Sequence, residues 1–147
     1  MSERMLSLSV EIEATPAEVF RMWTTEEGVA AFFTNAAKIE LKPGGAYEMY
    51  FLLDAPEGAR GSEGCTIIEF EEGRHLAFTW NFPPSLPAIR NEHTRVDITL
   101  TPLGPDRTRV ELLQSGWRCG REWNKGYEYF DQAWRQVLNN LQQHFAA

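Results

Sequence analysis

Cysteine and histidine are scarce in this chain, and their scarcity limits the chemistry that can be expected of it. The 147 residues include two cysteines, Cys65 and Cys119, and three histidines. Zinc sites need Cys and His at short, regular spacings, and neither such a spacing nor a known hydrolase motif is present. The two cysteines are too far apart for a CxxC pair, so we expect free thiols. We therefore expect no metal and no cofactor.

Positive charge and long apolar runs are also in short supply. Against 21 Asp and Glu residues there are 14 Lys and Arg, and the net charge is −7. Nucleic-acid binders and proteins on anionic membranes cluster basic residues, so we expect neither partner. No apolar run approaches the ~20 residues that a membrane helix needs, so no membrane insertion is expected. The opening residues do not look like a secretion signal, and a cytoplasmic protein is the expectation.

What the chain does have begins with a strand and two short helices. Residues 7–13 alternate apolar and polar side chains, the period of a half-buried strand. Thr15, Pro16 and Glu18 follow as a capping box with proline at the first helical position. Thr25 offers a second N-cap one short helix later. We expect all of this to belong to a single domain spanning residues 1–147.

The remainder predicts six more strands and one long closing helix. The strands are expected at residues 36–41, 46–51, 65–70, 75–82, 96–100 and 110–112. Adjacent Ile67 and Ile68 indicate a β-bulge. Residues 122–145 carry aromatic and aliphatic side chains at steps of three and four, which predicts a helix with one apolar face. Regular strand spacing is typical of an antiparallel meander.

The connections between these strands alternate in length. Tight turns follow residues 41, 70 and 100, whereas residues 53–63, 83–93 and 114–121 form long connections. In a meander, alternate connections lie at opposite ends of the sheet. The long loops should therefore share one end with the start of the closing helix, and that end is the expected mouth of a cavity.

Aromatic residues are more numerous than a core of this size needs. Small-ligand pockets are lined mainly by such side chains, although buried rings also simply pack together. The candidate ligand-binding residues are Trp23, Phe33, Met49, Phe51, Phe78, Trp80, Ile98, Trp117, Tyr127, Phe130 and Trp134. The mouth loops also carry Arg60, Arg90, Arg118 and Arg121, so an acidic head group is an alternative to a solvated loop surface.

Acid–base groups are few on the inward side of the predicted strands. Strand parity turns His75 and His93 outward, and it turns Gln114 inward, where an amide can hydrogen-bond but cannot titrate. No catalytic residue is therefore assigned.

The order of these motifs resembles the START-like (helix-grip, SRPBCC) proteins, in the branch related to the activator of the heat-shock-protein-ninety ATPase. The resemblance rests on Val10-x-Ile12-x-Ala14-x-Pro16-x-x-Val19-Phe20-x-x-Trp23, Pro43-Gly44-Gly45, Leu76-x-Phe78-x-Trp80 and Trp134-x-x-x-Leu138-x-x-Leu141. Two residues depart from it: Ala133, where many members have Gly, and Gln114, where many have His. The resemblance implies an α+β helix-grip fold, in which a seven-stranded antiparallel sheet wraps around a long C-terminal helix, with two short helices after the first strand.

Such a fold does not fix one activity. The leading hypothesis is binding of a small apolar or amphipathic molecule in an internal cavity. The alternatives are a protein-interaction module that contacts a chaperone or another protein, and a polyketide cyclase- or hydrolase-like enzyme. Homodimerisation is a further alternative, because an open sheet has an edge to protect.

Overall fold

A computed structural model describes residues 4–146 of the chain and has the α+β arrangement expected from the sequence. Its elements are β1 (Leu6–Ile12), α1 (Pro16–Thr24), α2 (Glu26–Phe32), β2 (Ala36–Ile39), β3 (Tyr47–Tyr50), β4 (Ile67–Glu71), β5 (His75–Trp80), β6 (Thr94–Gly104), β7 (Arg107–Ser115) and α3 (Arg121–Phe145). None of these helices is both long and apolar enough to cross a membrane.

All seven expected strands form, but they build two sheets instead of one. Five lie in the order β1-β7-β6-β5-β4, and β2 pairs with β3 separately, all antiparallel. Between β3 and the chain before β4 there are two isolated bridges, Ala46 with Thr66 and Tyr50 with Gly61. These bridges are one residue out of register, and Gly64 between them has a positive φ of 86°, so the pairing is interrupted and does not form a regular ladder. The expectation of a single seven-stranded sheet is corrected accordingly.

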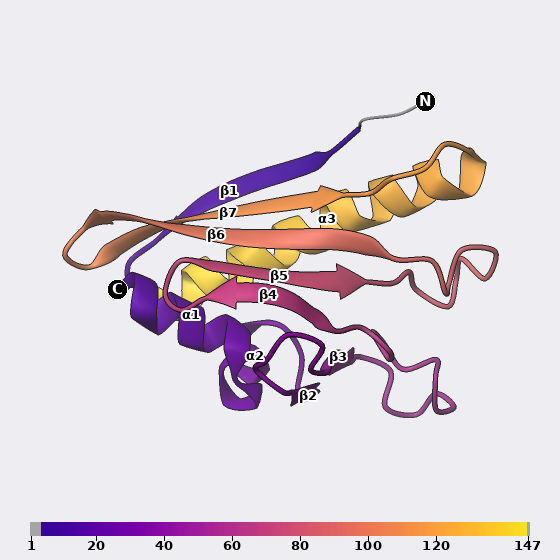
Figure 1. Ribbon diagram of the computed structural model, residues 1–147, viewed down its shortest axis with the longest axis horizontal. Coiled ribbons are helices and arrows are strands. Elements are labelled where there is room, and N and C mark those ends of the chain that lie inside the picture. Colours follow the sequence, from indigo (N-terminus) through magenta and orange to yellow (C-terminus); the bar gives the residue numbers. More distant parts are fainter. Residues whose placement is uncertain (1–3, 147) are drawn as a thin grey trace.

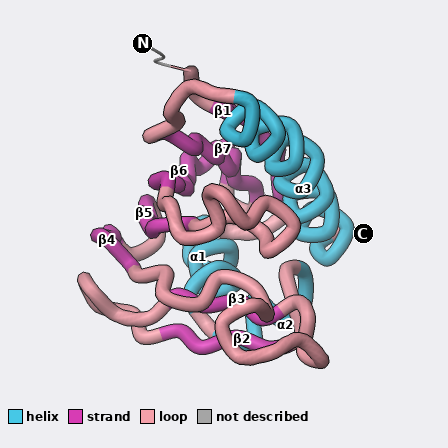
Figure 2. Tube along the Cα trace, turned by 90° about the vertical axis from the view of Figure 1, so that its right-hand side faces the viewer, coloured by secondary structure: helices cyan, strands magenta, loops and turns pink. Residues whose placement is uncertain are grey.

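The long helix α3 crosses one face of the five-stranded sheet (Figure 1). Viewed along the sheet, α3 stands on one side, while α2, β2 and β3 close the lower edge (Figure 2). The buried side of α3 largely follows the stripe predicted from the sequence. Its buried residues are Trp123, Gly126, Phe130, Trp134, Leu138 and Leu141; Gly126 was not predicted, and the predicted Tyr127, Val137 and Phe145 are only partly buried. The five-stranded sheet therefore covers one side of α3, as expected for a helix-grip fold, while α2, β2 and β3 close its lower edge.

Local signals in the sequence are also confirmed. The Thr15 hydroxyl accepts from the Glu18 N–H, and the Glu18 carboxylate accepts from the Thr15 N–H, which completes the capping box. The Thr25 hydroxyl accepts from the Gly28 N–H and caps α2. The β4–β5 pairing shifts register between Ile67 and Glu69, where a bulge was predicted.

The two ends of the molecule differ, as the loop lengths predict. The β6–β7 hairpin and the C-terminal end of α3 lie at one end (Figure 1). Residues 51–66, residues 81–93 and the start of α3 gather at the other end. The candidate site lies at the end of the molecule that carries the long loops.

Candidate functional site

Side chains fill most of the space between the sheet and the helices. Trp23, Met49 and Phe78 have no exposed surface, and Ile98 is 1% exposed. The Phe78 ring lies 4.4 Å from that of Tyr47, centroid to centroid. These four candidate ligand-binding residues therefore pack the core and line neither of the hollows described next.

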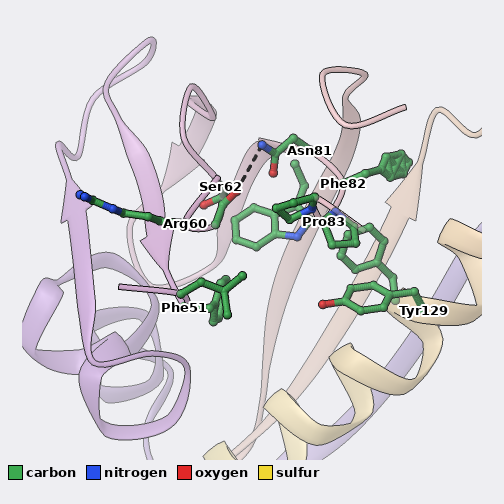
Figure 3. Close-up of a pocket in the computed structure, with 12 residues that line it drawn as sticks. Phe51, Arg60, Ser62, Asn81, Phe82, Pro83 and Tyr129 are labelled. Carbon is green, nitrogen blue, oxygen red and sulfur yellow. Dashed lines mark hydrogen bonds between the residues drawn. The ribbon is translucent and has the colours of Figure 1, made fainter. Parts of the chain in front are cut away.

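Two adjoining hollows lie between α3 and the ends of β3 and β5. One has a volume of about 140 Å³ and the other about 260 Å³, and both are lined by Phe51, Trp80, Tyr129 and Phe130. Loop residues such as Arg60, Ser62, Asn81, Phe82 and Pro83 complete the first hollow (Figure 3). The second is completed by Phe33, Ala133, Trp134, Gln136 and Val137. We call the two hollows together the aromatic groove.

Packed rings form the floor of the aromatic groove, and exposed rings form its rim. The Trp80 centroid lies 5.4 Å from that of Trp134 and 5.7 Å from that of Phe33. By contrast, Phe51 and Tyr129 are each 47% exposed. The groove is thus open to solvent and has a preformed apolar floor. Five of the candidate residues, Phe33, Phe51, Trp80, Phe130 and Trp134, line it.

The other two candidates, Trp117 and Tyr127, lie in a second ring cluster near the start of α3. The Trp117 ring packs 5.1 Å from Tyr127 and 5.9 Å from Phe82. Their polar atoms are used within the fold, since the Trp117 indole donates to the Gln114 carbonyl and the Tyr127 hydroxyl to the Met5 carbonyl. Neither residue lines the groove, so their predicted contact with a ligand stays a prediction.

Gln114 orients one ring of the groove floor. Its side chain is fully buried, as its inward strand parity predicts. The carboxamide oxygen accepts from the Trp134 indole at 2.9 Å, and the nitrogen donates to the Thr94 hydroxyl at 2.8 Å. Gln114 therefore holds Trp134 in place without lining the groove itself.

An ion pair holds the loop that forms one wall of the groove. The Arg90 guanidinium donates to the carbonyls of Gly61 (2.7 Å) and Gly58 (2.6 Å) and lies 3.2 Å from the Glu63 carboxylate. Burial alone would raise the pKa of Glu63, but the N–H groups of Arg60, Gly61 and Gly58 donate to its carboxylate and hold the pKa below its ordinary value. Arg90 is consequently a structural cation, bound to its own loops.

The remaining mouth arginines do not direct their charge into the groove. Arg60 lines the first hollow, but its Nε donates to the Ala55 carbonyl at 2.9 Å, and its guanidinium points away from the other labelled side chains (Figure 3). Arg118 lies 3.9 Å from Glu92, and Arg118 and Arg121 are both exposed and line neither hollow. Within residues 4–146, no Asp, Glu or His lines either hollow. The groove is therefore apolar, with a few uncharged polar groups.

Several lining residues were not singled out from the sequence. Tyr129 sits two residues beyond Tyr127 and just before Phe130, off the buried stripe of α3, and only its aromatic character hints at a role. Asn81 was expected within a strand at residues 75–82, but β5 ends at Trp80, so Asn81 lies in the connection that follows. Ala133 was noted as a departure from the resembled family, and its side chain lines the second hollow.

Comparison with known proteins identifies a family over nearly the whole chain. The model of the family described as Activator of Hsp90 ATPase homolog 1-like protein matches residues 13–146. No curated protein sequence matches the chain.

Solved structures share the fold at low sequence identity. Protein MLL2253 from Mesorhizobium loti is 22% identical, with a TM-score of 0.76 and coverage of 96% of each chain. The Aha1 dimer from Colwellia psychrerythraea is 16% identical, with a TM-score of 0.72 and coverage of 97% of this chain and 96% of that one. PFC0360w from Plasmodium falciparum, described as an HSP90 activator, is 15% identical, with a TM-score of 0.69 and coverage of 95% and 94%. These likenesses establish a common fold.

Proposed function

We propose that this chain, which belongs to the family of Activator of Hsp90 ATPase homolog 1-like proteins, binds a small apolar or amphipathic molecule in the aromatic groove. The observation that carries the proposal is the convergence of Phe51, Trp80, Tyr129 and Phe130 on two adjoining hollows. Ligand pockets in proteins typically combine such apolar walls with a few polar groups. The groove is small, which favours a compact ligand of one or two rings.

Filling the second hollow tests this proposal. Ala133 is half-buried and lines that hollow, so Ala133→Phe should place a ring where the ligand would lie. The matched control is Gln132→Phe, which adds the same ring at an exposed neighbouring position that lines neither hollow. Naphthalene serves as the probe, and its binding is followed by NMR shifts of the tryptophan indole N–H signals.

The wild-type protein and Gln132→Phe should show saturable shifts with naphthalene, and Ala133→Phe should bind at least about tenfold more weakly, because the ring removes the apolar surface that the probe would bury. Absence of saturable naphthalene binding to the wild-type protein would contradict the proposal. Equal naphthalene affinities of Ala133→Phe and Gln132→Phe would show that the probe binds outside the second hollow. The amide spectrum of each variant establishes that it is folded.

The enzyme alternative has less support than ligand binding. A cyclase- or hydrolase-like mechanism by the usual acid–base route needs a titratable group beside the substrate. Among the described residues the groove lining includes no Asp, Glu or His; it offers amide, hydroxyl and indole groups, the phenol of the half-exposed Tyr129 and the outward-turned Arg60. Non-covalent binding of a ligand needs no acid–base group, so the groove lining is sufficient for it.

A second candidate function, contact with another protein, is favoured by one specific feature. Phe51, Leu52 and Leu53 are consecutive and 47%, 53% and 58% exposed, and apolar surface of this kind often marks a protein contact. We call this run the 51–53 patch. Two structural neighbours are described as an Aha1 dimer and an HSP90 activator, so both self-association and a chaperone contact are worth testing.

The chaperone contact is tested by titrating purified Hsp90 in a calorimeter. Leu53→Glu places a charge in the 51–53 patch and should weaken binding about tenfold or more. Leu103→Glu is the control, because Leu103 is also exposed but lies in β6 beside the hairpin at the opposite end. If the wild type does not bind, or if both variants bind as well as it does, this second function is rejected.

A further inference from the structure

We infer that the ligand of the aromatic groove carries an uncharged polar group, with both a hydrogen-bond acceptor and a donor, recognised by the Trp80 indole N–H and the Asn81 side-chain carbonyl. This inference rests on the proposed ligand-binding function and specifies the chemical class of its ligand. A carboxamide on an aromatic or alicyclic body is the simplest group of this kind.

Asn81 supplies the acceptor. It is only 6% exposed and lines the first hollow. Its Nδ2 donates to the carbonyls of Gly61 and Glu63, both at 3.4 Å. Because both neighbours are acceptors, the amide nitrogen must face them, and the oxygen is turned the other way, in among the lining residues (Figure 3). None of the described residues donates to this oxygen.

Trp80 supplies the donor. Its ring is 4% exposed and lines both hollows. The indoles of Trp117 and Trp134 donate to Gln114, whereas no acceptor for the Trp80 N–H exists among the described residues. Unlike the N–H of Trp23, which is sealed off without a partner, that of Trp80 keeps contact with solvent. A polar group that is almost buried and unpaired gains free energy when a ligand pairs with it.

The chain geometry brings these two neighbours to the same hollow. Side chains of consecutive residues in a strand point to opposite faces. However, β5 ends at Trp80, and Asn81 already belongs to the long connection. The backbone therefore leaves the strand between them, and both side chains line one hollow.

The charges around the groove argue against a buried ionised head group. Arg60 turns its guanidinium outward, and Arg90 is already bound to loop carbonyls and Glu63. A buried carboxylate would thus meet no cation, and a buried ammonium would meet no carboxylate. Burying an unpaired charge costs far more than burying a neutral amide that is hydrogen-bonded.

Three probes that share one ring system test the inference: naphthalene, 2-naphthamide and 2-naphthoate, titrated at neutral pH and followed by NMR. We expect 2-naphthamide to bind about tenfold more tightly than naphthalene, since it can satisfy both free groups. The charged 2-naphthoate should bind more weakly than naphthalene because its charge finds no partner.

Two variants assign the effect to the named atoms. Trp80→Phe removes the donor and keeps a ring, and Asn81→Leu removes the acceptor at similar volume. Each should reduce the ratio of 2-naphthamide to naphthalene affinity about fivefold. Asn91→Leu, at an exposed position of the same connection, is the control and should leave the ratio unchanged. Using a ratio cancels any general loosening of the groove.

The outcomes separate this inference from the function on which it rests. If naphthalene binds but 2-naphthoate equals or exceeds 2-naphthamide, the neutral-ligand inference is overturned and groove binding survives. If the ratio is unaffected by Trp80→Phe and Asn81→Leu, the two groups are not the recognition elements. If no probe binds at all, the proposed function and this inference both fall.

Discussion

Gln114 illustrates how one buried polar residue stabilises this fold. An amide with no exposed surface must find partners inside the protein, and Gln114 finds the Trp134 indole and the Thr94 hydroxyl. A histidine at this position, as the resembled family often has, would introduce a titratable group. Because a glutamine side chain does not titrate, its hydrogen bond to Trp134 does not depend on the protonation state of residue 114.

Replacing Gln114 by leucine should therefore be costly. The Trp134 N–H loses its acceptor and the Thr94 hydroxyl loses a donor, and leaving buried groups unpaired costs about 1–3 kcal/mol. Urea unfolding measures the loss. Gln132→Leu changes the same atoms at an exposed site and should leave the unfolding midpoint nearly unchanged. Equal midpoints for both variants would show that the Gln114 hydrogen bonds do not stabilise the fold.

Glu63 makes the groove wall sensitive to acid. Its carboxylate accepts from the N–H groups of Gly58, Arg60 and Gly61, and its pKa lies below the ordinary value of 4.5. A lowered pKa in the folded state means that the carboxylate stabilises the loop at neutral pH. That contribution is lost as the pH falls below about 4.5, through the folded-state pKa.

Hydrogen-exchange protection factors of the Gly58, Arg60 and Gly61 amides should accordingly drop as the pH is lowered from neutrality to the acid range. Glu63→Gln cannot titrate and should show weak protection with no acid-dependent step. Glu57→Gln, at an exposed residue of the same loop, should retain the wild-type profile. A profile that is flat in the wild type would contradict the assigned role of Glu63.

Among the secondary-structure elements, α1 and α2 meet in a close-packed corner at Gly28. A Cβ atom added to Gly28 would lie 2.6 Å from the Met22 Cα and carbonyl oxygen and 2.7 Å from the Arg21 carbonyl oxygen. These are backbone atoms of α1, which cannot move aside as a flexible side chain can. Gly28 therefore lets α2 pack directly on α1.

Gly28→Ala should destabilise the protein despite the better helix propensity of alanine. The propensity gain is about 1 kcal/mol, whereas forced overpacking costs about 1–3 kcal/mol and here involves backbone. Thermal unfolding should therefore show a lower midpoint. Gly104→Ala provides the comparison, because nothing lies within 4 Å of its added Cβ. A Gly28→Ala protein as stable as wild type would mean that α2 shifts without cost.

The elements themselves were largely predictable, because local interactions decide them. The capping box of Thr15 and Glu18 acts over three residues, and the apolar stripe of α3 repeats every three or four. The division into two sheets was not predictable. It depends on the one-residue mismatch between the bridges of Ala46 and Tyr50, which is a relation between segments about 20 residues or less apart that no local pattern records.

At the level of the whole molecule, charge and exposed apolar surface act against each other. The net charge of −7 makes copies of the chain repel, while the 51–53 patch offers an apolar contact. Salt screens the repulsion and leaves hydrophobic contact intact. Any self-association through the patch should therefore strengthen with ionic strength.

Sedimentation velocity should show a larger dimer fraction at about 500 mM than at about 50 mM NaCl, where the Debye length is longer. Leu53→Glu should remain monomeric under both conditions, since the added charge sits in the patch. Leu103→Glu adds the same charge at the opposite end and should follow the wild type. A monomer at both salt concentrations would exclude the 51–53 patch as a dimer contact.

The sequence alone predicts the order of the elements, the C-terminal helix that the sheet grips, the long loops at one end and the inward position of Gln114. All of these follow from periodicity and from interactions between residues close in the chain. The tertiary structure alone decides which rings fill the core and which leave space. Phe78 and Trp80 have the same strand parity, yet Phe78 is packed against Tyr47 while Trp80 lines the groove. Space is what remains after distant segments have packed, so no single segment can encode it.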